Sequence, residues 1–143
     1  MSQSNLIPLA VNGTLMRGLE LNQNLLAIGA QFDREACTAA CYRLWSIDDR
    51  HPAMQRVTSD GSSIALEIWL VPSVGLASLL LGEPEGLAIG RIVLADGTTL
   101  LGVLGEAILC DGQREITAYG GWRSYQAAIA KTPKIMADPI DQS

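Results

Sequence analysis

The chain has 143 residues, of which 48% are hydrophobic and 17% charged, a composition typical of one globular domain rather than a disordered chain. Its formal net charge is −5 and its basic residues are scattered, which argues against a nucleic-acid partner. No apolar run is long enough to cross a bilayer, and the first five residues carry no charged side chain. We therefore expect no membrane partner and a cytoplasmic location.

The first predicted elements in chain order are a strand over residues 7–11 and a short helix that begins near Asn22. Asn22 is the predicted N-cap of this helix, and Gly29 is its predicted stop. The apolar residues of the helix are Leu25, Leu26 and Ile28. A second strand is predicted over residues 42–47, and the polar stretch 48–52 after it is typical of a loop.

Three Asp-Gly pairs predict tight turns, because both residues tolerate the positive φ that such turns need. They are Asp60-Gly61, Asp96-Gly97 and Asp111-Gly112. The first pair predicts a hairpin between residues 54–57 and 64–70. The second pair predicts a hairpin between residues 89–94 and 99–104.

Glu67 lies in the middle of the otherwise apolar predicted strand 64–70. Side chains alternate between the two faces of a strand, so Glu67 and Trp69 share one face. Simple alternation predicts that Glu67 faces solvent. A buried Trp69 would instead place this carboxylate in the protein interior.

Two further helices complete the predicted elements. One is capped by Ser73 and stops at Gly82. Its inward residues are expected to be Leu76, Leu79 and Leu80. The other has the i, i+3, i+7 spacing of a packed face and ends before Pro133. The residues of that face are Trp122, Tyr125 and Ile129.

Together these elements predict an α+β fold, a small and mainly antiparallel β-barrel or sheet with a few short helices. The sequence contains no internal repeat and no second domain. We expect one domain over residues 1–132 and a C-terminal tail over residues 133–143.

The cysteines and the histidine give little support for a metal site. Cys37 and Cys41 are four residues apart, but no second cysteine pair completes a zinc site, so we expect Cys37, Cys41 and Cys110 to be buried structural thiols. His51 is the only histidine. It could act as a general base, but an exposed loop residue is the favoured interpretation. The sequence carries no P-loop or dinucleotide fingerprint, and we expect neither metal nor cofactor.

The segment most typical of a site is the glycine turn after the first strand. Gly13 permits a close backbone approach or a positive φ, and successive N–H groups in such a turn can hold a carboxylate or another anion. Thr14 adds a hydroxyl and Arg17 a positive charge. Spacing alone favours an ordinary strand-to-helix connection. The candidate ligand-binding residues are Asn12, Gly13, Thr14, Leu15, Met16 and Arg17.

Glu83 and Glu85 are the candidate catalytic residues. They follow a predicted helix and precede a predicted strand, so one of them could face a cavity at the end of the sheet. A general base of this type requires a pKa raised by burial. Solvated loop carboxylates are the common alternative.

The sequence resembles a known family in several stretches. The run 10–18, Ala-Val-Asn-Gly-Thr-Leu-Met-Arg-Gly, is similar to the strand and glycine turn of the gamma-glutamylcyclotransferase-like fold. A closer resemblance, over residues 7–127, is to the C-terminal domain of allophanate hydrolase, which has the same fold. Its most specific stretch is 114–125, Arg-Glu-Ile-Thr-Ala-Tyr-Gly-Gly-Trp-Arg-Ser-Tyr.

This resemblance implies a stand-alone domain that binds a small carboxylated or amide-containing metabolite of urea or nitrogen metabolism. In allophanate hydrolase the domain follows an amidase, and it is proposed to finish the degradation of the amidase product by decarboxylation. The resemblance implies that the glycine turn holds the ligand and that Glu83 is the favoured acid or base. Asn12 stands where cyclotransferases have an aromatic residue, and Thr14 where allophanate hydrolases tend to have a histidine.

Two alternatives remain open, and so does the question of whether the domain is an enzyme at all. One is a gamma-glutamylcyclotransferase-like enzyme that releases 5-oxoproline, whose Glu-Gly pattern would place the general base at Glu85. The other is a non-catalytic accessory domain that partners a separate amidase subunit. A homodimer is a further open possibility.

Overall fold

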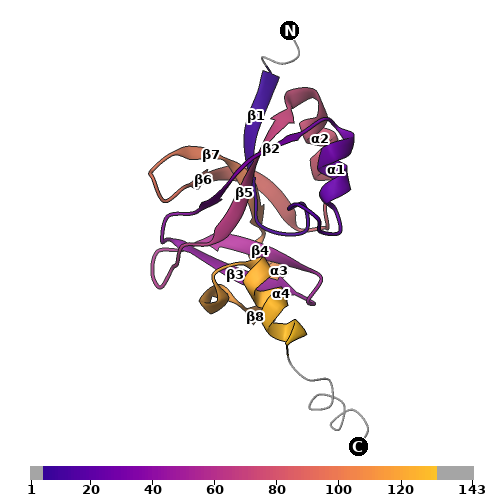
Figure 1. Ribbon diagram of the computed structural model, residues 1–143. Coiled ribbons are helices and arrows are strands. Elements are labelled where there is room, and N and C mark those ends of the chain that lie inside the picture. Colours follow the sequence, from indigo (N-terminus) through magenta and orange to yellow (C-terminus); the bar gives the residue numbers. More distant parts are fainter. Residues whose placement is uncertain (1–4, 132–143) are drawn as a thin grey trace, which may run out of the picture.

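Five strands form the larger sheet, in the order β2-β5-β1-β7-β6 (Figure 1). The computed structural model describes residues 5–131. All neighbouring strands are antiparallel except β1 and β7, which are parallel. The bounds are Leu6–Val11 for β1, Gln31–Cys37 for β2, Ala65–Pro72 for β5, Leu87–Val93 for β6 and Thr99–Gly105 for β7.

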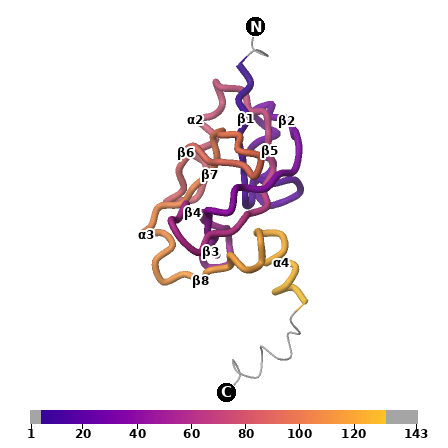
Figure 2. The backbone as a smooth tube through the Cα atoms, turned by 90° about the vertical axis from the view of Figure 1, so that its left-hand side faces the viewer, coloured from indigo at the N-terminus to yellow at the C-terminus, as the bar shows by residue number. Residues whose placement is uncertain are grey.

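A smaller antiparallel sheet has the order β4-β3-β8. Its strands are β3 (Tyr42–Ile47), β4 (His51–Arg56) and β8 (Arg114–Glu115). The helices are α1 (Asn22–Ala27), α2 (Ser73–Leu81), α3 (Ala107–Cys110) and α4 (Trp122–Ala130), with a 3₁₀ turn over Thr117–Tyr119. Figures 1 and 2 both place α4 beside the smaller sheet, at the end of the molecule opposite the start of β1.

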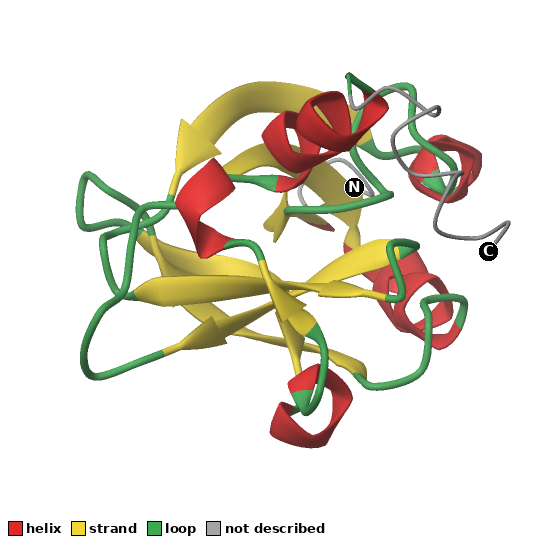
Figure 3. Cartoon of the chain, turned by 90° about the horizontal axis from the view of Figure 1, so that it is seen from below, coloured by secondary structure: helices red, strands yellow, loops and turns green. Residues whose placement is uncertain are grey.

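The two sheets do not close into one barrel, although they pack against each other (Figure 3). The free edges of the larger sheet, β2 and β6, meet through a single bridge between Thr38 and Leu94. The predicted α+β architecture with mainly antiparallel pairing is confirmed. The sequence predicted either a small β-barrel or a sheet, and the structure has two open sheets.

The predicted strands over residues 7–11 and 42–47 are confirmed, and so is the β6–β7 hairpin at Asp96-Gly97. The hairpin predicted at Asp60-Gly61 is wrong. β4 pairs with β3, whereas β5 crosses into the larger sheet and lies between β1 and β2. Asp111-Gly112 forms a turn between α3 and β8, which are not partners in a hairpin. Local turn chemistry is the same at all three places, but the partner of each strand is chosen by long-range packing.

The helix predictions are confirmed in position and corrected at their caps. α1 begins at Asn22 itself, with Leu21 as the N-cap, and α2 begins at Ser73 after Pro72. Neither N-cap makes a side-chain hydrogen bond. The packed face of α4 is confirmed, with Trp122 and Tyr125 buried. The expected stop at Pro133 and the tail lie outside the described residues. No helix within the described range has the length and apolar character needed to span a membrane.

β5 is the central strand of the core and is buried on both faces. Ile68 is fully buried on one face, and Glu67 and Trp69 are each 2% exposed on the other. The prediction of a solvent-facing Glu67 is therefore wrong, because Arg17 after the glycine turn and Arg123 of α4 cover this face and bond to its carboxylate. The expectation of buried thiols holds for Cys110 alone. Cys37 is exposed because it ends the edge strand β2.

Candidate functional site

The glycine turn is fixed to its surroundings by backbone hydrogen bonds. The Met16 N–H donates to the Gly13 carbonyl at 2.9 Å, and the Leu21 N–H donates to the Thr14 carbonyl at 2.9 Å. The Asn22 side chain donates to the Leu15 carbonyl at 2.8 Å, which ties the start of α1 to the turn. These bonds hold the turn in one conformation at the end of β1.

Gly13 is needed for a close approach rather than for an unusual φ. A Cβ atom at this position would lie 2.5 Å from Cδ of Pro52 in β4. That distance is too short for any side chain, so glycine lets the turn contact the smaller sheet directly. The contact brings residues from both sheets to one place.

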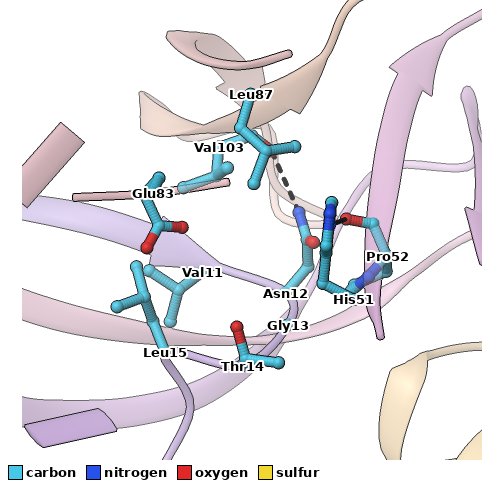
Figure 4. A pocket seen from close by; sticks show the side chains of 10 residues that line it. All are labelled: Val11, Asn12, Gly13, Thr14, Leu15, His51, Pro52, Glu83, Leu87 and Val103. Carbon is cyan, nitrogen blue, oxygen red and sulfur yellow. Dashed lines mark hydrogen bonds between the residues drawn. The ribbon is translucent and has the colours of Figure 1, made fainter. Parts of the chain in front are cut away.

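A small cavity, here called the inner pocket, lies at this junction (Figure 4). Its enclosed part measures only about 10 Å³, room for about one water molecule, and the free space reaches about 250 Å³ when the open mouth is included, so a ligand larger than a water has to occupy the mouth as well. Its residues come from the end of β1 and the turn after it, from β4, β6 and β7, and from the segment after α2. They are Val11, Asn12, Gly13, Thr14, Leu15, His51, Pro52, Glu83, Leu87 and Val103.

Glu83 is the only acidic residue that lines the inner pocket. Its Oε2 atom is buried and has no hydrogen-bond partner among the described residues. Burial without a compensating charge disfavours the ionised carboxylate and raises the pKa of Glu83 from 4.5 to about 7. Both protonation states are therefore populated near neutral pH, as acid–base chemistry requires.

The residues of the glycine turn that line the pocket with Glu83 carry hydrogen-bond donors. In the described part of the chain, the N–H groups of Thr14 and Leu15 have no acceptor, and both residues are buried in the pocket wall. Figure 4 shows the Thr14 hydroxyl in the floor of the pocket, between Glu83 and Asn12. The Asn12 amide is held in place because its Nδ2 donates to the Val103 carbonyl at 3.0 Å. Two free N–H groups beside an unpaired carboxyl can hold an oxygen anion and exchange a proton with it.

His51 also lines the inner pocket and is only 8% exposed, so the expectation of an exposed loop residue is wrong. The residue begins β4, and the strand carries its ring under the turn. The ring nitrogen Nδ1 lies 3.1 Å from the Pro52 carbonyl. No pattern in the sequence indicated that His51 lies in the pocket. The contact of its neighbour Pro52 with Gly13 depends on the tertiary fold.

A wider, open depression, here called the outer cleft, adjoins the inner pocket. Thr14 and His51 line both cavities. Glu85 is exposed and lines the outer cleft, not the inner pocket. The buried Nε2 of Gln126, on α4, also faces this cleft and has no hydrogen-bond partner among the described residues. The two candidate carboxylates are thus separated, with Glu83 inside and Glu85 at the entrance.

Met16 and Arg17 do not line the inner pocket. Arg17 binds the buried Glu67, with its backbone N–H 2.9 Å from Oε1 and its Nε 3.1 Å from Oε2. Glu67 also accepts hydrogen bonds from Trp69 at 3.0 Å and from Arg123 of α4 at 3.1 Å. Burial alone would raise the pKa of Glu67, but these hydrogen bonds outweigh it and lower the pKa. Arg17 therefore anchors the turn from outside the pocket.

Within the described residues, no three His, Cys, Asp or Glu side chains gather as metal ligands. The groups that the inner pocket offers to a ligand are the carboxyl of Glu83, the imidazole of His51, and the hydroxyl and backbone donors of the turn.

Comparison with known proteins connects this geometry to a family. Residues 7–127 match the family described as the allophanate hydrolase C-terminal domain. Urea amidolyase of Saccharomyces cerevisiae is 31% identical over 135 residues, a match that covers 90% of this chain and 7% of that protein. The crystal structure of a uropathogenic E. coli-specific protein is 57% identical, with a TM-score of 0.85, and the match covers 85% of this chain and 96% of that one.

The allophanate hydrolase of Kluyveromyces lactis is 29% identical, with a TM-score of 0.82 over 87% of this chain and 22% of its own. The chain thus spans a small part of the curated relatives that it matches, 7% in the case of the yeast urea amidolyase. An aig2-like protein (ggact) from Mus musculus is 19% identical, with a TM-score of 0.55, a likeness of fold alone. The expected fold, shared with gamma-glutamylcyclotransferase-like proteins, is confirmed.

Proposed function

The chain belongs to the family of allophanate hydrolase C-terminal domains, and on this basis we propose that its inner pocket binds a small carboxylated or amide-containing metabolite and removes carbon dioxide from it. The observation that carries the proposal is the buried, unpaired Oε2 of Glu83 in the same pocket as Thr14 and Leu15, whose N–H groups have no acceptor among the described residues. Urea and nitrogen metabolism is the expected setting, because the similar full-length proteins are named urea amidolyase and allophanate hydrolase.

The proposed chemistry is a proton transfer coupled to bond cleavage. An N-carboxylated amide loses carbon dioxide when its C–N bond breaks and the nitrogen gains a proton. Glu83 in its protonated form supplies that proton, and the resulting carboxylate regains one from water. The free N–H groups of the turn hold an oxygen of the ligand and keep its nitrogen within reach of Glu83. The pKa of about 7 suits this role, because a catalytic acid acts best near the working pH.

The test supplies the substrate from a separate amidase that opens allophanate. Adding the wild-type protein should accelerate the release of carbon dioxide, and Glu83→Gln should lose most of this acceleration, about 100-fold or more, because a positioned acid is typically worth that factor. Glu106→Gln is the matched control, since Glu106 is an exposed carboxylate outside both cavities. Equal rates with and without the wild-type protein would refute decarboxylation. Formation of 5-oxoproline from gamma-glutamyl peptides would support the cyclotransferase branch instead.

A second candidate function is that of an accessory domain that docks on an amidase. The matched region makes up 22% of the K. lactis allophanate hydrolase chain, so a relative carries this domain within a larger enzyme. Co-purification of the protein with an amidase subunit, at a fixed ratio, would support this alternative. Turnover of a metabolite by the protein alone would count against it.

A further inference from the structure

His51 is held in one orientation at the boundary of the two cavities. A backbone carbonyl can only accept a hydrogen bond, so the contact with the Pro52 carbonyl at 3.1 Å places the proton of the neutral ring on Nδ1. Pro52 is itself fixed, because its ring packs against Gly13 of the turn. The ring of His51 and the turn therefore form one rigid unit.

The second ring nitrogen, Nε2, is left for a ligand. No described residue forms a hydrogen bond or an ion pair with it, and the side chain lines both the inner pocket and the outer cleft. When Nδ1 carries the proton, Nε2 of the neutral ring is a hydrogen-bond acceptor. Figure 4 shows the ring on the side of the pocket opposite Glu83, next to Asn12.

With the proton on Nδ1 alone, the ring adds one acceptor to the two free donors of the turn. A carboxylate satisfies only the donors, because it has no N–H or O–H of its own. A planar amide or carbamate satisfies both, with its oxygen on the N–H groups of Thr14 and Leu15 and its N–H on Nε2 of His51.

We propose that His51 is a specificity-determining residue that selects ligands carrying an amide-type N–H beside the oxygen bound by the glycine turn. This inference rests on the proposed ligand site and adds the chemical group that the site recognises. One additional hydrogen bond between ligand and protein is worth up to about a factor of ten in affinity. A ligand without the N–H should therefore bind about tenfold more weakly.

Oxamate and pyruvate form a matched pair of probes for this test. Both have a carboxylate and an adjacent carbonyl, and they differ in an NH₂ group on oxamate that is a methyl group on pyruvate. His51 is the only histidine in the sequence, so its imidazole nitrogen signals in an NMR spectrum are unambiguous. We expect the free protein to show the Nδ1–H tautomer. Oxamate should shift the Nε2 signal saturably and bind about tenfold more tightly than pyruvate.

His51→Asn is the variant that isolates Nε2. An asparagine amide can still donate to the Pro52 carbonyl from the position of Nδ1, but it has no group at the position of Nε2. The variant should keep the wild-type thermal unfolding midpoint within a few degrees and should bind oxamate and pyruvate equally. His51→Gln, which places its amide near the position of Nε2, should restore part of the preference.

The outcomes separate this inference from the proposed function. If the Thr14 and Leu15 amide signals shift equally with both probes and the His51 signals stay unchanged, the ligand site stands and the role of His51 is refuted. A preference for oxamate that survives in His51→Asn also refutes it. If neither probe shifts any signal of the pocket residues, the ligand site itself is refuted together with this inference.

Discussion

At the scale of single residues, Glu83 is stabilised in its neutral form by the fold. Its pKa is 4.5 in an unstructured chain and about 7 in the folded protein, because burial penalises the charge. Between these two values the folded state keeps a proton that the unfolded state has lost. The free energy of unfolding must therefore fall as the pH rises through this window.

This linkage gives a prediction for Glu83→Gln. The wild type should lose about 1–2 kcal/mol of stability between pH 4.5 and pH 8, an amount reduced by the partial exposure of the side chain, whereas the glutamine variant should lose less. Urea unfolding at several pH values measures both slopes. Equal slopes of the free energy of unfolding against pH for the two proteins would mean that Glu83 titrates normally. They would contradict its proposed role as the catalytic acid.

The sequence identified some residues of the site but not the contacts that define it. Glu83 was a candidate because it follows a helix and precedes a strand, and the glycine turn was a candidate because of its composition. Whether Glu83 or Glu85 lies inside depends on how the loop packs on β1, which no local pattern encodes. Glu67 gave a usable signal, a lone charge in an apolar strand beside a tryptophan, but its partners Arg17 and Arg123 are 50 and 56 residues away.

At the scale of elements, the β1 turn and the start of β4 fit together only because Gly13 has no side chain. A methyl group there would collide with the Pro52 ring, whose Cδ and Cγ atoms would lie 2.5 and 2.7 Å from it. Both partners are constrained, one by the hydrogen bonds of the turn and the other by its proline ring. The strain cannot be relieved by a simple rotamer change.

We therefore predict that Gly13→Ala lowers the free energy of unfolding by about 1–3 kcal/mol, the usual cost of overpacking. Gly82→Ala is the control, because a Cβ at that position would meet only ordinary contacts at 3.6 Å or more. Adding Pro52→Ala to Gly13→Ala should recover part of the loss. Chemical denaturation of the four proteins measures this, and equal stability of Gly13→Ala and Gly82→Ala would contradict the close contact.

The Asp-Gly turns predicted one strand pairing correctly and another wrongly. Asp96-Gly97 joins two strands that remain neighbours, so the local signal was sufficient. Asp60-Gly61 has the same chemistry, yet β4 and β5 on its two sides belong to different sheets. β5 lies between β1 and β2 in the larger sheet, where most of its residues are buried. The fold class and most strands and helices were thus predictable, but β2 and α3 were not, and of the two predicted hairpins only β6–β7 was correct.

At the scale of the whole molecule, α4 connects the two sheets. Arg123 bonds to Glu67 of the larger sheet at 3.1 Å and to the backbone of the glycine turn at Arg17. Two residues later, the Tyr125 hydroxyl donates to Asp49 at 2.6 Å, in the loop between β3 and β4 of the smaller sheet. The pocket lies where these sheets meet, so this helix supports the pocket without lining its interior.

The Tyr125 bond offers a test of that connection. Tyr125 is fully buried, and Asp49 also accepts a bond from Ser46, so hydrogen bonds from Ser46 and Tyr125 lower the pKa of Asp49. Tyr125→Phe should therefore reduce the free energy of unfolding by about 0.5–1.5 kcal/mol at neutral pH, because Asp49 is exposed and solvent screens its charge. The difference should shrink as the pH falls below 3.8 and through the lowered pKa of Asp49, because a protonated carboxyl is a weaker acceptor.

Tyr119→Phe is the matched control, since the Tyr119 hydroxyl makes no hydrogen bond within the described residues and the side chain is 42% exposed. If α4 joins the sheets, Tyr125→Phe should speed amide hydrogen exchange both in the helix and in the loop around Asp49, while the central strands β1 and β5 stay protected. Faster exchange confined to the helix would mean that the helix packs on the smaller sheet without holding it. In that case the position of His51, which follows the same loop, would depend on its pairing with Ile47 of β3, its contact with Pro52 and the packing of Pro52 on the glycine turn.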